Sequence, residues 1–300
     1  KNGRMLLGKG SGRRLYVACV SEATGWTAVG VAYTQELLRS RDRIYQTYLL
    51  IAAAGTPAET KITGAAAEPE ISDLLAYLRG CGALIESQSD GAILVQGREA
   101  LTGCCCHAIL PDRIEAATYL AAAAITGGEI TVYASPEHLA APLAALRRMG
   151  CRITTGEQSI TLTAPEHLQG AGSIVTLPYP GFPTDLQAIF MALAAAAEGY
   201  TAFTETVFPR RWAHVEELRR LGADITVVGS HAVIRGAHLI GSALTCTDLR
   251  AGAAVVLAAL AAKGESSVTA ISHIERGYAD FVPTPVSYTH LRAHETRSNL

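Results

Sequence analysis

The chain has 300 residues, 49% of them hydrophobic and 17% charged, with a formal net charge of −2, which fits one or two folded domains and excludes a disordered chain. The near-neutral charge and the 6% of aromatic residues argue against a nucleic-acid binder, and the longest apolar run, residues 251–262, is shorter than the about 18–20 residues that cross a bilayer. We therefore expect small-molecule chemistry, with no nucleic acid and no membrane as partner.

The opening segment, Lys1–Arg14, carries charge but no apolar core, so we do not expect a secretory signal. Its Gly-Lys-Gly-Ser-Gly stretch, residues 8–12, lacks the full pattern of a phosphate-binding loop and is given no role. The seven cysteines are an odd number, which fits a reducing cytoplasm better than a disulfide framework. Residues 104–106 are all cysteine, and because side chains alternate faces along a strand, we predict buried strand cysteines and no metal site with His107.

An internal repeat of about seventy residues organises most of the chain. An Ala-rich segment that ends at a glycine is followed by a strand-like stretch, an amphipathic segment and a short alternating run. The Ala-rich copies are residues 51–55, 119–128, 191–199 and 255–264, and the amphipathic copies are residues 74–85, 139–153 and 215–225. Pro142 interrupts the second amphipathic copy, so that helix should start late or kink. The period predicts stacked α/β modules rather than a doubly wound sheet.

The third copy indicates the elements most clearly. Residues 186–198 are expected to form a buried helix stopped by Gly199, and residues 201–208 alternate like a strand. Residues 214–221 predict an amphipathic helix, and residues 225–228 begin a hairpin. The predicted unit is therefore a helix, a strand, a second helix and two strands.

The Ala-rich helices share a polar start. The three starts are Pro111-Asp112-Arg113, Pro183-Thr184-Asp185 and Thr247-Asp248-Leu249-Arg250. Each could be simple helix capping. In a repeat protein, however, equivalent helix ends lie on the same side, so their positive ends and arginines can converge on one anion. We therefore predict a substrate that carries phosphate or carboxylate.

Several longer strings carry a family resemblance. They are residues 68–71 (Glu-Pro-Glu-Ile), 111–115 (Pro-Asp-Arg-Ile-Glu), 180–188 (Pro-Gly-Phe-Pro-Thr-Asp-Leu-Gln-Ala), 204–208 (Thr-Glu-Thr-Val-Phe), 247–250 (Thr-Asp-Leu-Arg) and 273–278 (His-Ile-Glu-Arg-Gly-Tyr). In order and approximate spacing, the chain resembles the UDP-N-acetylglucosamine 1-carboxyvinyltransferases, a family of enolpyruvyl transferases.

The resemblance covers about residues 46–280 and implies a fold. This is an inside-out α/β barrel of two domains, built from βαβαββ-like repeats, with the active site in the cleft between the domains. On this interpretation residues 44–110 are the last repeat of the first domain, and residues 111–285 are a truncated second domain. Residues 1–43 match nothing and look frame-shifted or unrelated, and residues 286–300 resemble a foreign tail, so the barrel is expected to be incomplete.

The resemblance also implies an activity. Such a transferase moves the enolpyruvyl group of phosphoenolpyruvate to the 3'-hydroxyl of UDP-N-acetylglucosamine, the first committed step of peptidoglycan synthesis, in the cytoplasm. The reaction needs a base near the sugar hydroxyl, cations for phosphate and carboxylate, and an acid for the methylene. By the resemblance, Asp185 is the catalytic residue that contacts and deprotonates the sugar hydroxyl, and Arg250 and Arg276 grip phosphoenolpyruvate.

Further substrate-binding residues follow from the same resemblance. They are Val207, Arg211, Asp248 and Leu249. Arg210 stands beside Arg211, so the sequence leaves open which of the two points inward. Arg113 and Glu115 are expected to be structural.

The chain also departs from the family. The mobile acid, a cysteine loop with a following arginine, has no match, and Cys19 is not given this role. The histidines lack metal-ligand spacing, so we expect no metal and no cofactor. The chain is expected to be an inactive fragment. Two alternatives stay open, a catalytically silent relative that binds a nucleotide sugar and the sister 3-phosphoshikimate 1-carboxyvinyltransferase.

Overall fold

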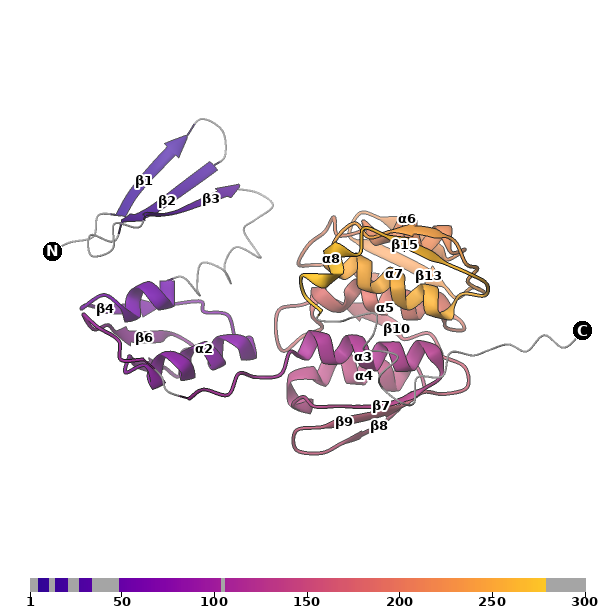
Figure 1. The fold of residues 1–300 in the computed structure, drawn as a ribbon, viewed down its shortest axis with the longest axis horizontal. Helices are drawn as coiled ribbons and strands as arrows, with labels where there is room; N and C mark the ends of the chain where they lie inside the picture. Colours follow the sequence, from indigo (N-terminus) through magenta and orange to yellow (C-terminus); the bar gives the residue numbers. More distant parts are fainter. Residues whose placement is uncertain (1–4, 11–13, 21–26, 34–48, 104–105, 279–300) are drawn as a thin grey trace, which may run out of the picture. The chain divides into compact units, whose positions relative to one another are not determined.

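The computed structural model describes residues 5–10, 14–20, 27–33, 49–103 and 106–278 (Figure 1). The chain divides into two compact units, Lys1–Ala108 and Ile109–Leu300. Each unit has a hydrophobic core of its own. In the described ranges no helix combines the length and the apolar character that crossing a membrane requires.

The first unit contains two three-stranded sheets. The strands β1 (Met5–Gly10), β2 (Arg14–Val20) and β3 (Thr27–Tyr33) pair antiparallel in chain order. The strands β4 (Glu59–Ile62), β5 (Leu84–Ser87) and β6 (Ile93–Gln96) pair in the order β4-β6-β5. The helix α2 (Pro69–Gly80) contributes Ile71, Leu75 and Leu78 to the same core as Ile85 and Val95 of this second sheet.

In the second unit three helices form the interior. They are α3 (Arg113–Thr126), α5 (Gln187–Ala196) and α7 (Leu249–Ala261), and they pack against one another. Nearly every residue of α3 and α5 is buried, as expected for helices that are apolar all round. The shorter helical elements are η1 (Pro136–Leu139), α4 (Ala140–Arg148), η2 (Thr184–Leu186), α6 (His214–Arg220) and α8 (Ser272–Glu275).

The strands of the second unit flank these helices. The first sheet is β7 (Glu129–Val132), β9 (Ile160–Thr163) and β8 (Arg152–Thr155), in that spatial order. The second is β10 (Gly172–Val175), β11 (Tyr200–Thr204), β13 (His231–Arg235) and β12 (Asp224–Val228). The strands β14 (Ala243–Thr245) and β15 (Ser267–Thr269) pair parallel. Because α3 contacts β7 and β9 while α5 contacts β11 and β13, the helices lie inside and the sheets outside (Figure 1).

The order of elements repeats along the chain, as predicted. A helix, a strand, a helix and two strands follow one another from residue 49 to β6, from α3 to β9, and from α5 to β13. In each copy the last strand lies in the middle of its sheet, giving β4-β6-β5, β7-β9-β8 and β11-β13-β12. A fourth copy begins with α7, β15 and α8. The predicted unit is therefore confirmed.

Helix ends differ in detail from the predicted glycine stops. The helix α3 ends at a left-handed Gly127 with φ 72°, one position before the expected Gly128. The helices α5 and α7 end before Gly199 and Gly264, whose φ angles of 87° and 95° instead form the turns into β11 and β15. The strand expected over residues 201–208 stops at Thr204, because the chain then turns around Glu205.

Two local predictions need correction. The α-helix of the second copy begins at Ala140, ahead of Pro142, which occupies the first turn where its missing N–H is not needed. Cys106 is exposed and belongs to no strand, so the prediction of buried strand cysteines is wrong for this residue. It lies in an irregular connection that contains Gly103 and Pro111, residues that do not favour a strand. Cys104 and Cys105 lie outside the described residues.

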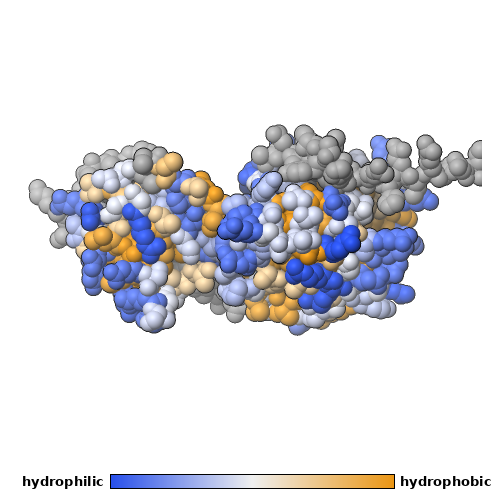
Figure 2. Space-filling model, turned by 90° about the horizontal axis from the view of Figure 1, so that it is seen from below, coloured by the Kyte–Doolittle hydropathy of each residue, from blue (hydrophilic) through white to orange (hydrophobic). Residues whose placement is uncertain are grey.

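Figure 2 shows apolar side chains that reach the surface among hydrophilic ones. In the four-stranded sheet, the exposed apolar residues include Tyr200, Val228 and Val233, with 61%, 70% and 47% of their surface accessible. These residues come from three adjacent strands, β11, β12 and β13. The sheet therefore turns a partly apolar face away from the helices.

Candidate active site

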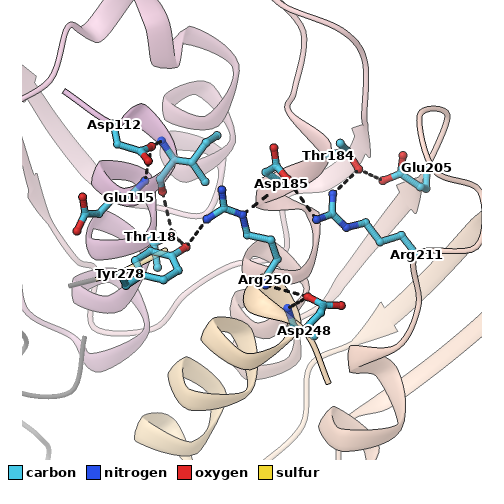
Figure 3. Close-up of polar contacts among 12 residues, drawn as sticks. Asp112, Glu115, Thr118, Thr184, Asp185, Glu205, Arg211, Asp248, Arg250 and Tyr278 are labelled. Carbon is cyan, nitrogen blue, oxygen red and sulfur yellow. Dashed lines mark hydrogen bonds and ion pairs between the residues drawn. The ribbon is translucent and has the colours of Figure 1, made fainter. Parts of the chain in front are cut away.

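The starts of α3, η2 and α7 lie together in the second unit. Figure 3 shows Asp112, Asp185 and Asp248, one from each start, around the side chain of Arg250. The side chain of Arg211 lies on the far side of Asp185 from Arg250. The repeat thus brings three equivalent helix starts and two arginines to one place.

Two of the three aspartates cap their helices. Oδ1 of Asp112 accepts hydrogen bonds from the backbone N–H groups of Ile114 at 2.7 Å and Glu115 at 3.1 Å. Oδ1 of Asp248 accepts from the N–H groups of Arg250 and Ala251, both at 2.8 Å. These bonds satisfy donors that have no partner within the helix. Asp112 and Asp248 therefore have an evident structural function.

Asp185 is placed differently. It lies in the 3₁₀ turn η2, and neither η2 nor α5 has a capping side chain. Its Oδ1 atom lies 3.2 Å from Nη2 of Arg211 and 3.7 Å from Nε of Arg250. The Asp185 side chain keeps 30% of its surface exposed. A carboxylate held between two guanidinium groups and open to solvent can meet an incoming hydroxyl, while the arginines can bind anionic oxygens.

Arg250 is held on its other side by Tyr278. Nη1 of Arg250 donates a hydrogen bond to Oη of Tyr278 at 3.0 Å. Burial lowers the pKa of Arg250, but Tyr278 and Asp185 raise it, and the net pKa lies above the ordinary value of arginine. Burial raises the pKa of Tyr278 above its ordinary value, although Arg250 opposes this. Arg250 therefore remains a cation and Tyr278 a neutral phenol near pH 7.

Arg211 is anchored through a buried carboxyl group. Nη1 of Arg211 donates to Oγ1 of Thr184 at 3.3 Å, and Thr184 donates to Oε2 of Glu205 at 2.9 Å. Glu205 is fully buried, and its Oε1 accepts from Thr176 Oγ1 and from the N–H groups of Val207 and Phe208. Glu205 thus ties the turn after β11 to the start of η2. Of the two neighbouring arginines, Arg211 contacts Asp185, whereas Arg210 is exposed.

The other residues implied by the sequence are spread more widely. Val207 lies in the turn around Glu205, and Leu249 packs against Gly277. Arg276 is exposed at the end of α8, and within residues 106–278 it forms no hydrogen bond or ion pair with the cluster. The cluster thus includes Asp185, Arg211, Asp248 and Arg250 but not Arg276.

Arg113 and Glu115, expected to be structural, belong to the start of α3. The Arg113 guanidinium lies 5.7 Å from the ring centre of Tyr179, and the Arg113 side chain is buried. Burial raises the pKa of Glu115, and the neighbouring Asp112 adds to this.

Sequence reasoning gave no role to Thr118, Thr184, Glu205 or Tyr278. Three of these stand inside the strings that carried the resemblance, where they were read only as part of a pattern. Thr118 had a weaker signal, as a polar residue within the apolar, Ala-rich segment of α3. A polar residue inside an all-apolar helix needs a partner, and this was the available clue.

His214 opens α6 and is almost completely buried. Its Nε2 atom lies 3.0 Å from Sδ of Met191. Burial lowers its pKa to about 4, so the imidazole is neutral near pH 7. The described residues contain no group of three potential ligands that could hold a metal ion.

Comparisons with known proteins give one family. The family model for EPSP synthase (3-phosphoshikimate 1-carboxyvinyltransferase) matches residues 44–284. A UDP-N-acetylglucosamine 1-carboxyvinyltransferase from Gluconacetobacter diazotrophicus is 46% identical over 232 residues, which are 77% of this chain and 55% of that protein. A second protein of this name, from Symbiobacterium thermophilum, is 47% identical over 77% of this chain and 52% of its own length. The chain spans about half the length of the curated relatives it matches.

Solved structures agree on the fold. The enolpyruvyl transferase NikO from Streptomyces tendae matches with a TM-score of 0.75 and 26% identity, over 92% of this chain and 68% of that chain. The EPSP synthase from Acinetobacter baumannii matches with a TM-score of 0.60 and 20% identity, over 80% of this chain and 58% of that chain. The prediction of an inside-out α/β barrel of the enolpyruvyl transferase type is confirmed by these matches.

Proposed function

This chain belongs to the EPSP synthase family of enolpyruvyl transferases, and from that premise we propose that its protein transfers the enolpyruvyl group of phosphoenolpyruvate to UDP-N-acetylglucosamine. A bond forms between the 3'-oxygen of the sugar and C2 of phosphoenolpyruvate. The bond from C2 to the phosphate oxygen breaks, phosphate leaves, and the hydroxyl proton is taken up by a base. The product is a precursor of peptidoglycan, and the free thiols of Cys81, Cys106, Cys151 and Cys246 support a cytoplasmic location.

The observation that carries this proposal is the setting of Asp185. Its carboxylate lies between two guanidinium groups and keeps part of its surface exposed to solvent. In the proposed reaction Asp185 orients the sugar 3'-hydroxyl and accepts its proton. Arg250 binds an anionic oxygen of phosphoenolpyruvate, and Arg211 lies beside the sugar nucleotide.

The remaining assignments extend outward from this cluster. We assign Val207 to a backbone contact with the sugar nucleotide, and Asp248 and Leu249 to contacts at the start of α7. Arg276 is assigned to phosphoenolpyruvate, and its exposed side chain is free of the cluster's hydrogen bonds and ion pairs in the described part of the chain. The acid that protonates the methylene carbon, and the base that removes a proton from that carbon as phosphate leaves, are given to no residue of this chain.

The choice of acceptor rests on the relatives. The matching family model has the name of the 3-phosphoshikimate enzyme, whereas the curated relatives at 44–47% identity have the name of the UDP-N-acetylglucosamine enzyme. This favours the nucleotide sugar over 3-phosphoshikimate as the acceptor. A silent nucleotide-sugar-binding relative would bind the same acceptor without releasing phosphate.

The test uses the full-length product of the gene, because this chain spans about half the length of its relatives. Phosphoenolpyruvate is mixed with either UDP-N-acetylglucosamine or 3-phosphoshikimate, and phosphate release is followed. We expect release with the nucleotide sugar only. Release with 3-phosphoshikimate instead, or tight binding of the nucleotide sugar without any phosphate, would overturn the proposal in favour of one of the alternatives.

A further inference from the structure

Arg250 is the first member of a chain of hydrogen bonds that leads away from Asp185 into the core. Its Nη1 atom donates to Oη of Tyr278 at 3.0 Å, and Oη of Tyr278 lies 2.9 Å from Oγ1 of Thr118. Thr118 in turn donates to the carbonyl oxygen of Ile114 at 2.8 Å. Figure 3 shows Arg250, Tyr278 and Thr118 next to one another. Thr118 is fully buried, and Tyr278 is 1% exposed.

The direction of each bond follows from the groups involved. A guanidinium only donates, so Oη of Tyr278 accepts from Arg250. The single hydroxyl proton of Thr118 is used on Ile114, so Oγ1 of Thr118 accepts from Tyr278. In these three bonds, each of the two hydroxyl groups donates once and accepts once. Such an arrangement has one proton order and favours one position of the guanidinium.

We propose that Tyr278 and Thr118 are positioning residues, whose two hydroxyl groups hold the guanidinium of Arg250 against Asp185. The contacts join α7, which carries Arg250, to α3 and to the residues that follow α8. Tyr278 contacts Arg250, Thr118 contacts Tyr278, and Arg250 contacts Asp185, so both hydroxyl groups can act through Arg250. The kinetic part of the inference rests on the proposed function, whereas the structural part does not.

Helix α3 contains matched control residues for Thr118 and Tyr278. Thr126 of α3 also bonds to the carbonyl four residues earlier, that of Ala122, at 2.8 Å, but it does not take part in the chain of bonds from Arg250. Tyr119 is buried in α3 and also lies outside that chain of bonds. Thr118→Val and Thr126→Val therefore make the same chemical change, as do Tyr278→Phe and Tyr119→Phe, and only the first of each pair touches the proposed function.

The first experiment observes Arg250 directly in the 300-residue chain. The arginine Nε–Hε signals are recorded by ¹⁵N NMR, and the signal lost in Arg250→Lys identifies Arg250. We expect Tyr278→Phe and Thr118→Val to shift this signal and to speed its hydrogen exchange about tenfold, because a bond to a charged group is lost. Thr126→Val and Tyr119→Phe should leave it in place.

Conservative rescue separates the hydroxyl from the packing. Thr118→Ser keeps the hydroxyl and loses the methyl group, so it should give the wild-type Arg250 signal while Thr118→Val does not. If Thr118→Val resembled the wild type and Thr118→Ser did not, packing rather than hydrogen bonding would fix Arg250, and the proposal would be overturned. An unchanged signal in both Tyr278→Phe and Thr118→Val would overturn it as well. If Tyr278→Phe folds poorly, the comparison of Thr118→Val with Thr118→Ser decides. If Thr118→Val folds poorly, Tyr278→Phe against Tyr119→Phe decides.

The second experiment measures the same variants in the full-length protein. We expect kcat/KM for phosphoenolpyruvate to fall about tenfold in Tyr278→Phe and Thr118→Val, mainly through KM, with an unchanged pH profile. An effect on kcat alone, equal in the control variants, would contradict the positioning role. If the full-length protein showed no transferase activity, the proposed function would fail, while the NMR result would still judge the inference.

Discussion

The start of α5 differs from the starts of α3 and α7 in how it uses its aspartate. Asp112 and Asp248 accept two backbone hydrogen bonds each and so cap their helices. Asp185 stands at the equivalent start, yet the chain enters α5 through a 3₁₀ turn with no capping side chain. At this start of the repeat the aspartate carboxylate contacts two arginines.

The difference shows what a repeat contributes to a binding site. Repetition brings equivalent helix ends together, where positive ends and polar side chains gather. Two of these ends then stabilise the fold, and the third is available for chemistry. At the third start, the hydroxyl of Thr184 donates to the buried Glu205. This bond fixes the turn in the way that a capping bond fixes the other two starts.

The largest effect is expected from Asp185→Asn in the full-length protein. An amide of the same shape cannot take the hydroxyl proton, so kcat should fall by about a thousandfold. Asp112→Asn, the matched change at a capping aspartate, should leave kcat within about twofold, since it acts on stability alone. Phosphate release from phosphoenolpyruvate measures both. If kcat fell equally in the two variants, Asp185 and Asp112 would not differ in function.

Glu205→Gln tests the anchor of the uncapped start. Four donors point at the buried carboxyl group, and glutamine places an N–H group against one of them. We expect the free energy of unfolding of the chain to fall by about 2–3 kcal/mol, measured by urea denaturation. Glu216→Gln on α6, where the side chain is 73% exposed, should change it by less than about 0.5 kcal/mol. If both variants changed the free energy of unfolding by a similar amount, Glu205 would not anchor this turn.

Low pH should reduce the stability of the second unit at the start of α6, where His214 is buried. The folded pKa of His214, about 4, is lower than its unfolded value near 6.5, so the unfolded state binds the proton more readily. The stabilisation is therefore complete above about pH 6.5 and is lost as the pH falls toward 4, by about 2–3 kcal/mol.

The measurement compares urea unfolding at neutral pH and at about pH 4.5, where most of this loss is expected. His214→Gln should lose less stability between these pH values than the wild type. His167→Gln, a change at an exposed histidine, should lose as much as the wild type. A wild-type pH dependence in His214→Gln would show that His214 does not cause the loss.

The smallest effect is expected at the two caps. Asp112→Ala and Asp248→Ala should each lower the free energy of unfolding by about 1 kcal/mol, because two backbone donors lose their acceptor. Asp112→Ser should recover most of this loss, since serine also caps helices. At position 185, in contrast, serine should not replace aspartate: the full-length Asp185→Ser protein should show no turnover. The comparison would fail if serine restored function at position 185, since any capping residue would then suffice there.

Much of the fold could be predicted because it repeats. Hydrophobic periodicity in the third copy predicted the helix from His214, the hairpin near Gly229 and the order of the elements, and the structure confirms all three. Local signals failed where long-range packing decides the end of an element. Thr204 ends β11 because the next carboxyl group, Glu205, binds the backbone of its own turn, which no alternation pattern encodes.

The site was less accessible to sequence reasoning. Family strings pointed to Asp185, Arg211 and Arg250, and the structure brings these three together. Two of the residues that hold this cluster, Tyr278 and Thr118, are 160 residues apart in the sequence. Their contact therefore depends on the whole stack of helices. The choice between Arg210 and Arg211 was equally beyond a pattern, since it depends on which way one turn faces.

The strand order within each copy has a consequence for how the protein is made. The sheet β7-β9-β8 and the pairings of β13 with β11 and with β12 use residues that are close in sequence. A chain leaving the ribosome can thus complete one module before the next is synthesised. The cluster around Asp185, in contrast, needs residues of three modules and is finished only when Tyr278 arrives. The contacts of Asp185, Arg250 and Tyr278 therefore form only after all three modules have been synthesised.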